Sequence, residues 1–160
     1  MQLNTVFNAK IIISLITCLL WGLMVSFSAH STPPFDELRA KNAGADEYGM
    51  KHYVMAFLKR GPNRDRTQAQ AEQLQRAHLD NITRLANEGK LVLAGPFLHD
   101  GELRGIYVFD VTTVEEAKAL TETDPAIQAG SLVLELLPWY GSAALTEVNE
   151  LHRVMAKKDI

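Results

Sequence analysis

Residues 72–85, EQLQRAHLDNITRL, contain the pattern on which the fold prediction rests. At helical spacing, Leu74, Ile82 and Leu85 lie along one apolar stripe, which is typical of a helix packed on a core. His78 stands in the middle of this stripe, four residues from Leu74 and four from Ile82. The stretch therefore predicts a helix that directs a titratable ring toward the interior of a domain.

The segments around this helix complete a pattern of four strands and two helices. Gly89 closes the first helix, and Asp100-Gly101 is a strong hairpin signal. The expected elements are strand 52–59, helix 67–87, strand 90–97, strand 104–111, a helix from Thr112 or Thr113 to about Thr123, and strand 131–139. This β-α-β-β-α-β order predicts an α+β fold of the ferredoxin-like type, in which one antiparallel sheet carries both helices on one face.

The predicted strands are apolar on both faces. In the first strand the two alternating sets of side chains are Tyr53, Met55 and Phe57 on one side and Val54, Ala56 and Leu58 on the other. Two helices cover only one face of such a sheet, and apolar area left in water forfeits about 25 cal/mol per Å². We therefore predict that a second copy covers the other face, in a homodimer packed sheet to sheet.

The first 31 residues have the features of an export signal. Lys10 is the only charged residue before an unbroken apolar run from Ile11 to Ala29, and small residues follow at its exit. We predict a signal peptide over residues 1–31, cut after Ser31, with Ser28 as the next best position. The run is also long enough to span a bilayer, so an uncleaved membrane anchor is the alternative. In both cases the remainder of the chain is expected outside the cytoplasm, in the periplasm or secreted. A membrane is a partner only if the leader is not cleaved.

The remaining chain of about 130 residues is enough for one domain with one core. We expect a linker at residues 32–49, the domain at 50–141 and a tail at 142–160. The tail has apolar residues at helical spacing, so it is expected to be helical and to pack on the body or on a partner.

Composition excludes several classes of function. Removing the leader, which contains one base and no acid, lowers the formal net charge from −3 to −4. The chain has no basic stripe interleaved with aromatic residues, which argues against a nucleic-acid partner. Cys18, the single cysteine, lies in the leader, so the mature protein has no disulfide and no thiol nucleophile. His52, His99 and His152 lack the spacing of metal ligands, and no metal or cofactor is expected.

The second predicted helix repeats the oddity of the first. Val114, Ala117 and Leu120 form its inward stripe, and the next position on that stripe is Asp124. Both helices lie on one face of the sheet, so His78 and Asp124 can approach one another. A carboxylate beside an imidazole orients the ring and selects its tautomer, an arrangement that suits general acid–base chemistry.

Each candidate residue also has a structural interpretation. His78 could be a core histidine bonded to a backbone carbonyl, and Asp124 stands directly before Pro125 as a helix N-cap does. The two roles of Asp124 are compatible, because a capping carboxylate retains a second oxygen. Gly95 and Pro96 end a predicted strand, either as a close backbone approach to a substrate or as an edge-strand stop.

Several motifs resemble the YCII-related (YciI-like) family. They are AHLDNI at 77–82, GKLVLAGPF at 89–97, GIYVF at 105–109, EEAKAL at 115–120, DPAIQAG at 124–130 and LPWY at 137–140. The resemblance covers about residues 51–141 and implies a dimeric α+β barrel akin to muconolactone isomerase. It also implies a His/Asp pair at an active site, which falls on His78 and Asp124. The relative with known chemistry eliminates hydrogen chloride from a chlorinated muconolactone-type substrate; the export leader and the C-terminal extension depart from the family pattern.

Two functions remain open at this stage. The first is a cofactor-free lyase or isomerase acting on a small apolar acid or lactone. In it, His78 would abstract a proton, Asp124 would orient the ring, and backbone amides near Gly95 would meet the developing enolate. The second is a non-catalytic small-ligand-binding or stress-related dimeric module, with the same pair as a buried polar lock. The sequence does not specify a substrate.

Overall fold

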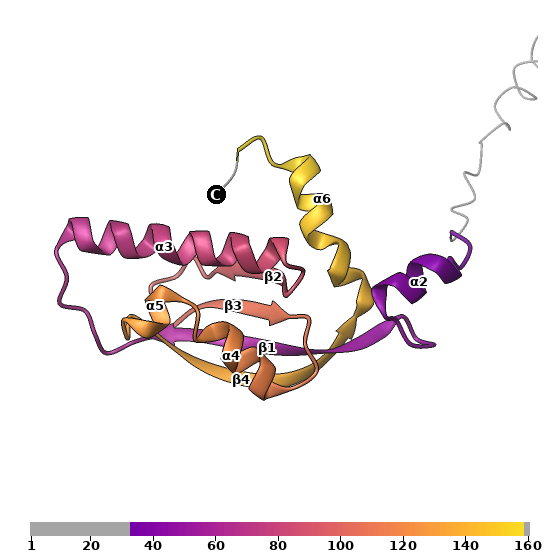
Figure 1. Ribbon diagram of the computed structural model, residues 1–160, viewed down its shortest axis with the longest axis horizontal. Helices are drawn as coiled ribbons and strands as arrows, with labels where there is room; N and C mark the ends of the chain where they lie inside the picture. The colour runs from indigo at the N-terminus through magenta and orange to yellow at the C-terminus, as the bar shows by residue number, and fades with distance from the viewer. Residues whose placement is uncertain (1–32, 159–160) are drawn as a thin grey trace, which may run out of the picture. The chain divides into compact units, whose positions relative to one another are not determined.

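The computed structural model describes residues 33–158 and contains a four-stranded antiparallel sheet in the order β2-β3-β1-β4 (Figure 1). Its strands are β1 (Met50–Arg60), β2 (Leu91–Pro96), β3 (Leu103–Phe109) and β4 (Leu132–Ser142). The helices between them are α3 (Gln68–Asn87), which follows β1, and α4 (Val114–Thr121) and α5 (Pro125–Gln128), which follow β3. The predicted α+β fold and its β-α-β-β-α-β order are confirmed.

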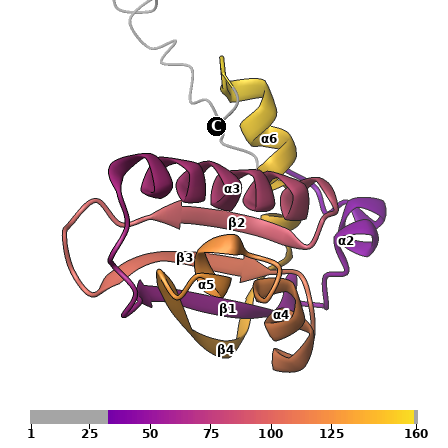
Figure 2. The ribbon, with the colours of Figure 1, turned by 60° about the vertical axis from the view of Figure 1, so that its left-hand side comes forward.

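The ends of α3 follow from local sequence. Thr67 and Gln70 form a capping box, in which each side chain accepts a hydrogen bond from the backbone N–H of the other. At the far end Gly89 has a φ of +68°, a left-handed conformation that favours glycine. Leu85 is fully buried, and α3 contacts β2, along which it runs in Figure 2.

The helix-covered face of the sheet holds the main hydrophobic core. Its buried members come from β1, α3, β2, β3 and the α4 region: Val54, Ala56, Leu58, Leu85, Leu91, Tyr107, Phe109, Val111 and Ala117. α4 and α5 contact β4, while α3 contacts both β2 and α5. As a result α5 and the middle of α3 lie close together over the same face of the sheet, which is where the candidate site forms (Figure 2).

The C-terminal segment covers one end of the opposite sheet face. After β4 the chain forms a 3₁₀ helix, η1 (Ala143–Glu147), which contacts β1 and β2, and then α6 (Val148–Met155), which contacts β2. Leu145 packs against a second buried cluster made of Tyr53, Val92 and Val108. Asn149 donates to the Leu91 carbonyl at 2.7 Å and so occupies part of the β2 edge. The prediction that a second copy covers this face therefore applies only to the remainder of it.

The segment expected to be a linker, residues 32–49, contains a helix. α2 (Glu37–Ala43) starts at the Asp36 N-cap and ends at Gly44, whose φ is +68°. An ion pair between Arg39 and Glu147 ties it to η1. α2 has no buried residue, and therefore it shows no apolar stripe by which the sequence could have revealed it.

The predicted leader, residues 1–31, lies outside the described residues. Within residues 33–158, none of the helices combines the length and the apolar character needed to cross a membrane.

We predict that Gly61→Ala destabilises the protein by about 1–3 kcal/mol, the usual cost of overpacking a tight site. A β-carbon at Gly61 would lie 2.2 Å from the Gly130 carbonyl oxygen, where β1 leaves the sheet against the turn before β4. Gly95→Ala is the matched control, because a β-carbon there meets nothing within 4 Å. Urea unfolding of both variants measures the difference. Equal unfolding free energies would show that this crossing is not tightly packed.

Candidate functional site

Three polar side chains from three elements meet beneath α3. His78 comes from the middle of α3, Asp124 from the residue that precedes α5, and Tyr107 from β3. The Nδ1 atom of His78 lies 2.9 Å from Oδ1 and 2.8 Å from Oδ2 of Asp124. The Tyr107 hydroxyl donates to Asp124 Oδ2 at 3.2 Å. The structure thus brings together the two residues that the helical stripes singled out, and it adds a tyrosine.

Asp124 is both a helix cap and the partner of the histidine. Its Oδ1 accepts a hydrogen bond from the Ala126 backbone N–H at 2.9 Å, which caps α5. Its side chain is only 1% exposed, so every lone pair directed at the protein needs a donor. The donors are the Ala126 amide, the His78 ring and the Tyr107 hydroxyl, a set suited to a carboxylate, which only accepts.

These contacts select the tautomer of His78. Because both Asp124 oxygens face Nδ1, the proton of a neutral ring belongs on Nδ1, which donates to the carboxylate. Nε2 then carries a lone pair, with the Tyr107 hydroxyl 3.4 Å away. Burial first, and then the charge and hydrogen bond of Asp124, raise the pKa of Tyr107 far above its usual range. Tyr107 therefore remains a neutral phenol that donates a hydrogen bond.

His78 lines a cavity of about 280 Å³ between α3, the sheet and α5. This volume lies just below the range of about 300–1,000 Å³ typical of small-molecule sites, so it suits a ligand of one-ring size. The lining residues are Arg64, Arg66, Ala71, Leu74, Gln75, His78, Arg104, Ala126, Ser131 and Leu132. Three of these side chains are cations and none is an acid, so the cavity favours an anionic ligand.

The cavity arginines of the loop before α3 are held by backbone carbonyls. Arg66 donates to the carbonyl of Asn63 at 2.5 Å and to that of Ala129 at 2.6 Å, and Arg64 donates to the carbonyl of Ser131 at 3.3 Å. Among the described residues, neither guanidinium forms an ion pair with a carboxylate. Their charge is therefore oriented but not neutralised by a neighbouring acid.

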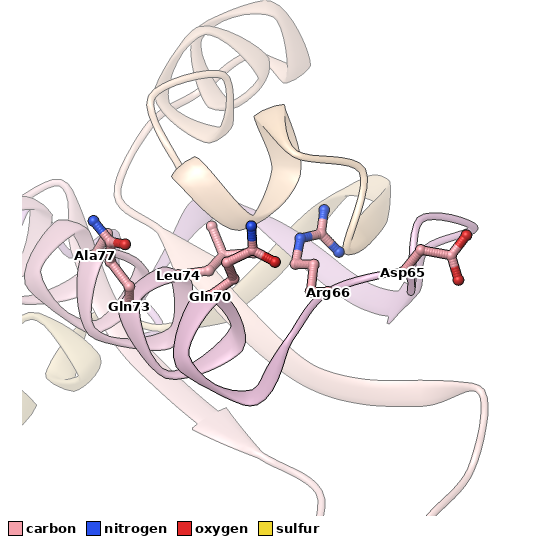
Figure 3. A pocket seen from close by; sticks show the side chains of 6 residues that line it. All are labelled: Asp65, Arg66, Gln70, Gln73, Leu74 and Ala77. Atoms are coloured by element: carbon pink, nitrogen blue, oxygen red, sulfur yellow. The ribbon is translucent and has the colours of Figure 1, made fainter.

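A second, wider depression lies beside this cavity, along the first half of α3 and the loop before it (Figure 3). It is lined by Asp65, Arg66, Gln70, Gln73, Leu74 and Ala77, and so it shares Arg66 and Leu74 with the cavity. It contains neither His78 nor Asp124 and is open to solvent. The cavity at His78 is therefore the candidate site.

Gly95 and Pro96, the expected substrate-binding residues, do not line the cavity. Both lie exposed near the end of β2, an edge strand, whereas the sheet residues around the cavity come from β3 and β4. No group of three or more His, Cys, Asp or Glu side chains within residues 33–158 could hold a metal ion.

The sequence interpretation did not single out Tyr107 or the cavity arginines. Tyr107 alternates with its neighbours along β3 as any core aromatic would, so nothing local marked it. Arg64 and Arg66 belong to RGPNRDR, residues 60–66, whose Gly, Pro and Asn are typical of the end of a strand and do not indicate a binding site. The available signal was their position directly before the helix that carries His78.

Comparison with known proteins places the chain in a family. The YCII-related domain matches residues 53–140, against the 50–141 expected for the domain. The chain belongs to the YCII-related family. No curated protein matches this YCII-related chain.

Among solved structures, the chain is similar to the 5-chloro-2-hydroxyhydroquinone dehydrochlorinase from Burkholderia phenoliruptrix AC1100, in complex with 2,5-dihydroxybenzoquinone. The two are 18% identical, and the match covers 54% of this chain and 92% of the dehydrochlorinase, with a TM-score of 0.41.

We predict that His78 and Asp124 are energetically coupled by about 1 kcal/mol or more, within the range of about 0.5–3 kcal/mol for directly contacting residues. The measurement is a double-mutant cycle of unfolding free energies with His78→Gln, Asp124→Asn and the double variant. Asn retains much of the capping ability of Asp124, so the cycle reports the pair rather than the cap. The control cycle joins His78→Gln to Glu116→Gln in the α4 cap, where additive effects are expected. Additivity for the first pair as well would refute the coupling.

Proposed function

We propose that this protein is an exported, cofactor-free lyase or isomerase that acts on a small anionic molecule bearing a carbonyl group. The observation that carries the proposal is the orientation of His78. Its Nδ1 is anchored on Asp124, so a neutral ring has the lone pair of a base on Nε2, and His78 lines a cavity that also contains three arginines. Export, to the periplasm or beyond, is supported by the apolar run at residues 11–29 alone.

In the proposed reaction, Nε2 of His78 takes a proton from a carbon next to the carbonyl. The electron pair of the broken C–H bond moves toward the carbonyl oxygen and forms an enolate. The cationic ring that results is stabilised by the Asp124 carboxylate. In an isomerase the proton then returns to another carbon; in a lyase the electron pair returns and expels a leaving group from the neighbouring carbon.

The two arginines of the loop before α3, Arg64 and Arg66, are the best-supported partners for the enolate oxygen. The sequence alone predicts backbone amides near Gly95 in that role, but Gly95 does not line the cavity. A guanidinium held in place by backbone carbonyls, as Arg66 is, offers an oriented positive charge where negative charge develops. The substrate is therefore revised from a mostly apolar acid or lactone to an anion of one-ring size.

We predict that the mature protein catalyses exchange of carbon-bound hydrogen for deuterium in one or more small oxo acids or lactones. His78→Gln should slow this exchange by about 10²–10⁴-fold, the usual contribution of a general base. His99→Gln is the matched control, since His99 is exposed in the loop after β2 and does not line the cavity. Proton NMR in D₂O follows the exchange.

Two outcomes would contradict the proposal. Exchange that survives His78→Gln would assign the base elsewhere. Ligands that bind without any exchange would favour the alternative, a non-catalytic binding module.

We also propose that the protein is a homodimer through the part of the sheet that η1 and α6 leave uncovered. Val133 and Leu137 of β4 are 42% and 43% exposed there, and half-buried Met55, Phe57 and Ile106 extend this apolar patch onto β1 and β3. One ion pair, Lys59–Glu135, lies within the patch. An apolar patch of this kind on a sheet edge invites a partner or aggregation. A second copy presents the same patch, so the contact is self-complementary.

We predict that residues 32–160 elute with twice the monomer mass at micromolar concentration. Leu137→Lys should shift the protein to monomer, because it introduces a charge into the proposed contact without disturbing the buried core. Leu98→Lys, at a loop position that is 99% exposed, should leave the dimer intact. Light scattering coupled to size exclusion measures the mass. A stable, soluble monomer of the unmodified chain would contradict the proposal.

A further inference from the structure

Arg104 reaches the cavity because of an irregularity in the sheet. Leu58 of β1 pairs with Gly105 and Lys59 pairs with Leu103, so Arg104 is an extra residue with no partner on β1. Gly105 is buried on the helix-covered face, and strict alternation would turn its neighbour Arg104 to the opposite face. A bulge at this point re-aims the side chain, and Arg104 lines the cavity together with His78.

The counter-ion of Arg104 is poorly placed to hold it. Asp100 of the β2–β3 loop accepts from Arg104 at 3.0 Å, but its side chain is 87% exposed and it also pairs with Arg60 at 2.5 Å. The hydrogen bond and charge of Arg60, and then the charge of Arg104, hold the pKa of Asp100 below its ordinary value. If a ligand replaced Asp100 on Arg104, Asp100 would stay solvated and paired. An exposed ion pair of this kind is worth little, so the exchange costs little.

The other cations approach the same cavity from a different side. Arg64 and Arg66 precede α3 and bond to carbonyls of the turn before β4, whereas Arg104 belongs to β3, and β1 separates β3 from β4 in the sheet. The cavity thus has two cationic subsites: the loop subsite of Arg64 and Arg66, and the sheet subsite of Arg104. One anionic group on a ligand of one-ring size can satisfy only one of them well.

We infer that the substrate is a dianion, a one-ring-sized molecule with two acidic groups, and that Arg104 is the residue that selects for the second group. One acidic group binds at the loop subsite, and the other displaces Asp100 from Arg104. Guanidinium–carboxylate pairs are directional and charge-assisted, which makes them suited to this selection. The inference rests on the proposed function only in taking the His78 cavity as the binding site; it concerns the substrate class and not the reaction.

The test is calorimetric binding of a matched series of probes to the mature protein: benzoate, isophthalate, terephthalate and neutral isophthalamide. At low salt, one of the two dicarboxylates should bind about tenfold or more tighter than benzoate, the gain expected of one added charged hydrogen-bonded pair. Arg104→Met should abolish this preference while leaving benzoate affinity within about twofold. Asp100→Asn should strengthen dicarboxylate binding more than benzoate binding, since it removes the internal competitor. Arg76→Met, at an exposed α3 position outside the cavity, should change neither.

Equal affinity for benzoate and both dicarboxylates would overturn the inference, as would an Arg104→Met variant that weakens all probes equally. The measurements are repeated in the His78→Gln protein to separate this inference from the proposed reaction. A dicarboxylate preference in both proteins, together with no exchange activity of the unmodified protein on any substrate, would support the substrate class and contradict the proposed reaction. Exchange activity on monocarboxylates without any dicarboxylate preference would support the proposed reaction and contradict the dianionic substrate class.

Discussion

A carboxylate that is 1% exposed must be supplied with hydrogen-bond donors, and the supply of donors to Asp124 organises the site. One donor is the amide of Ala126, which starts α5; the second is the ring of His78 on α3; the third is the hydroxyl of Tyr107 on β3. The same contacts that satisfy the buried charge hold α5 and α3 over the sheet. They also leave the lone pair of a neutral ring on Nε2, 3.4 Å from the Tyr107 hydroxyl. Structural and chemical roles therefore coincide in one residue.

The electrostatics of the cavity contrast with those of the whole chain. The chain has a formal net charge of −3, yet the cavity lining contains three arginines and no acid. Two of these arginines are oriented by carbonyls of the turn before β4, and the third is turned inward by a bulge in β3. A cluster of cations in an acidic domain raises the local concentration of small anions and repels cationic ligands. The base and the charges that recognise a ligand are thus parts of one cavity.

Helical periodicity made the His78–Asp124 pair predictable from the sequence. The residues that strands contribute to the site, Tyr107 and Arg104, were not predictable in this way. His78 and Asp124 were visible because each interrupts an apolar stripe, a local signal with a fixed spacing. The order of strands and helices along the chain was visible from other local signals, the strand-like runs and the Asp100-Gly101 hairpin. Tyr107 was not predictable. In a strand of alternating side chains, a tyrosine that only packs in the core has the same sequence pattern as one whose hydroxyl forms a hydrogen bond in a site. Arg104 depends on a bulge, which exists only in the pairing between strands. The helix α2 escaped detection because it buries no residue.

The central claim, that Asp124 fixes the proton of His78 on Nδ1 and leaves Nε2 as a base, is tested most directly by ¹⁵N NMR of the imidazole rings. The spectrum is recorded on the unmodified protein at a pH where all rings are neutral, with the exposed His99 and His152 as internal references. The structure predicts a protonated Nδ1 and an unprotonated Nε2 for His78. A ring protonated on Nε2 would have no lone pair there to act as a base, and it would contradict the account.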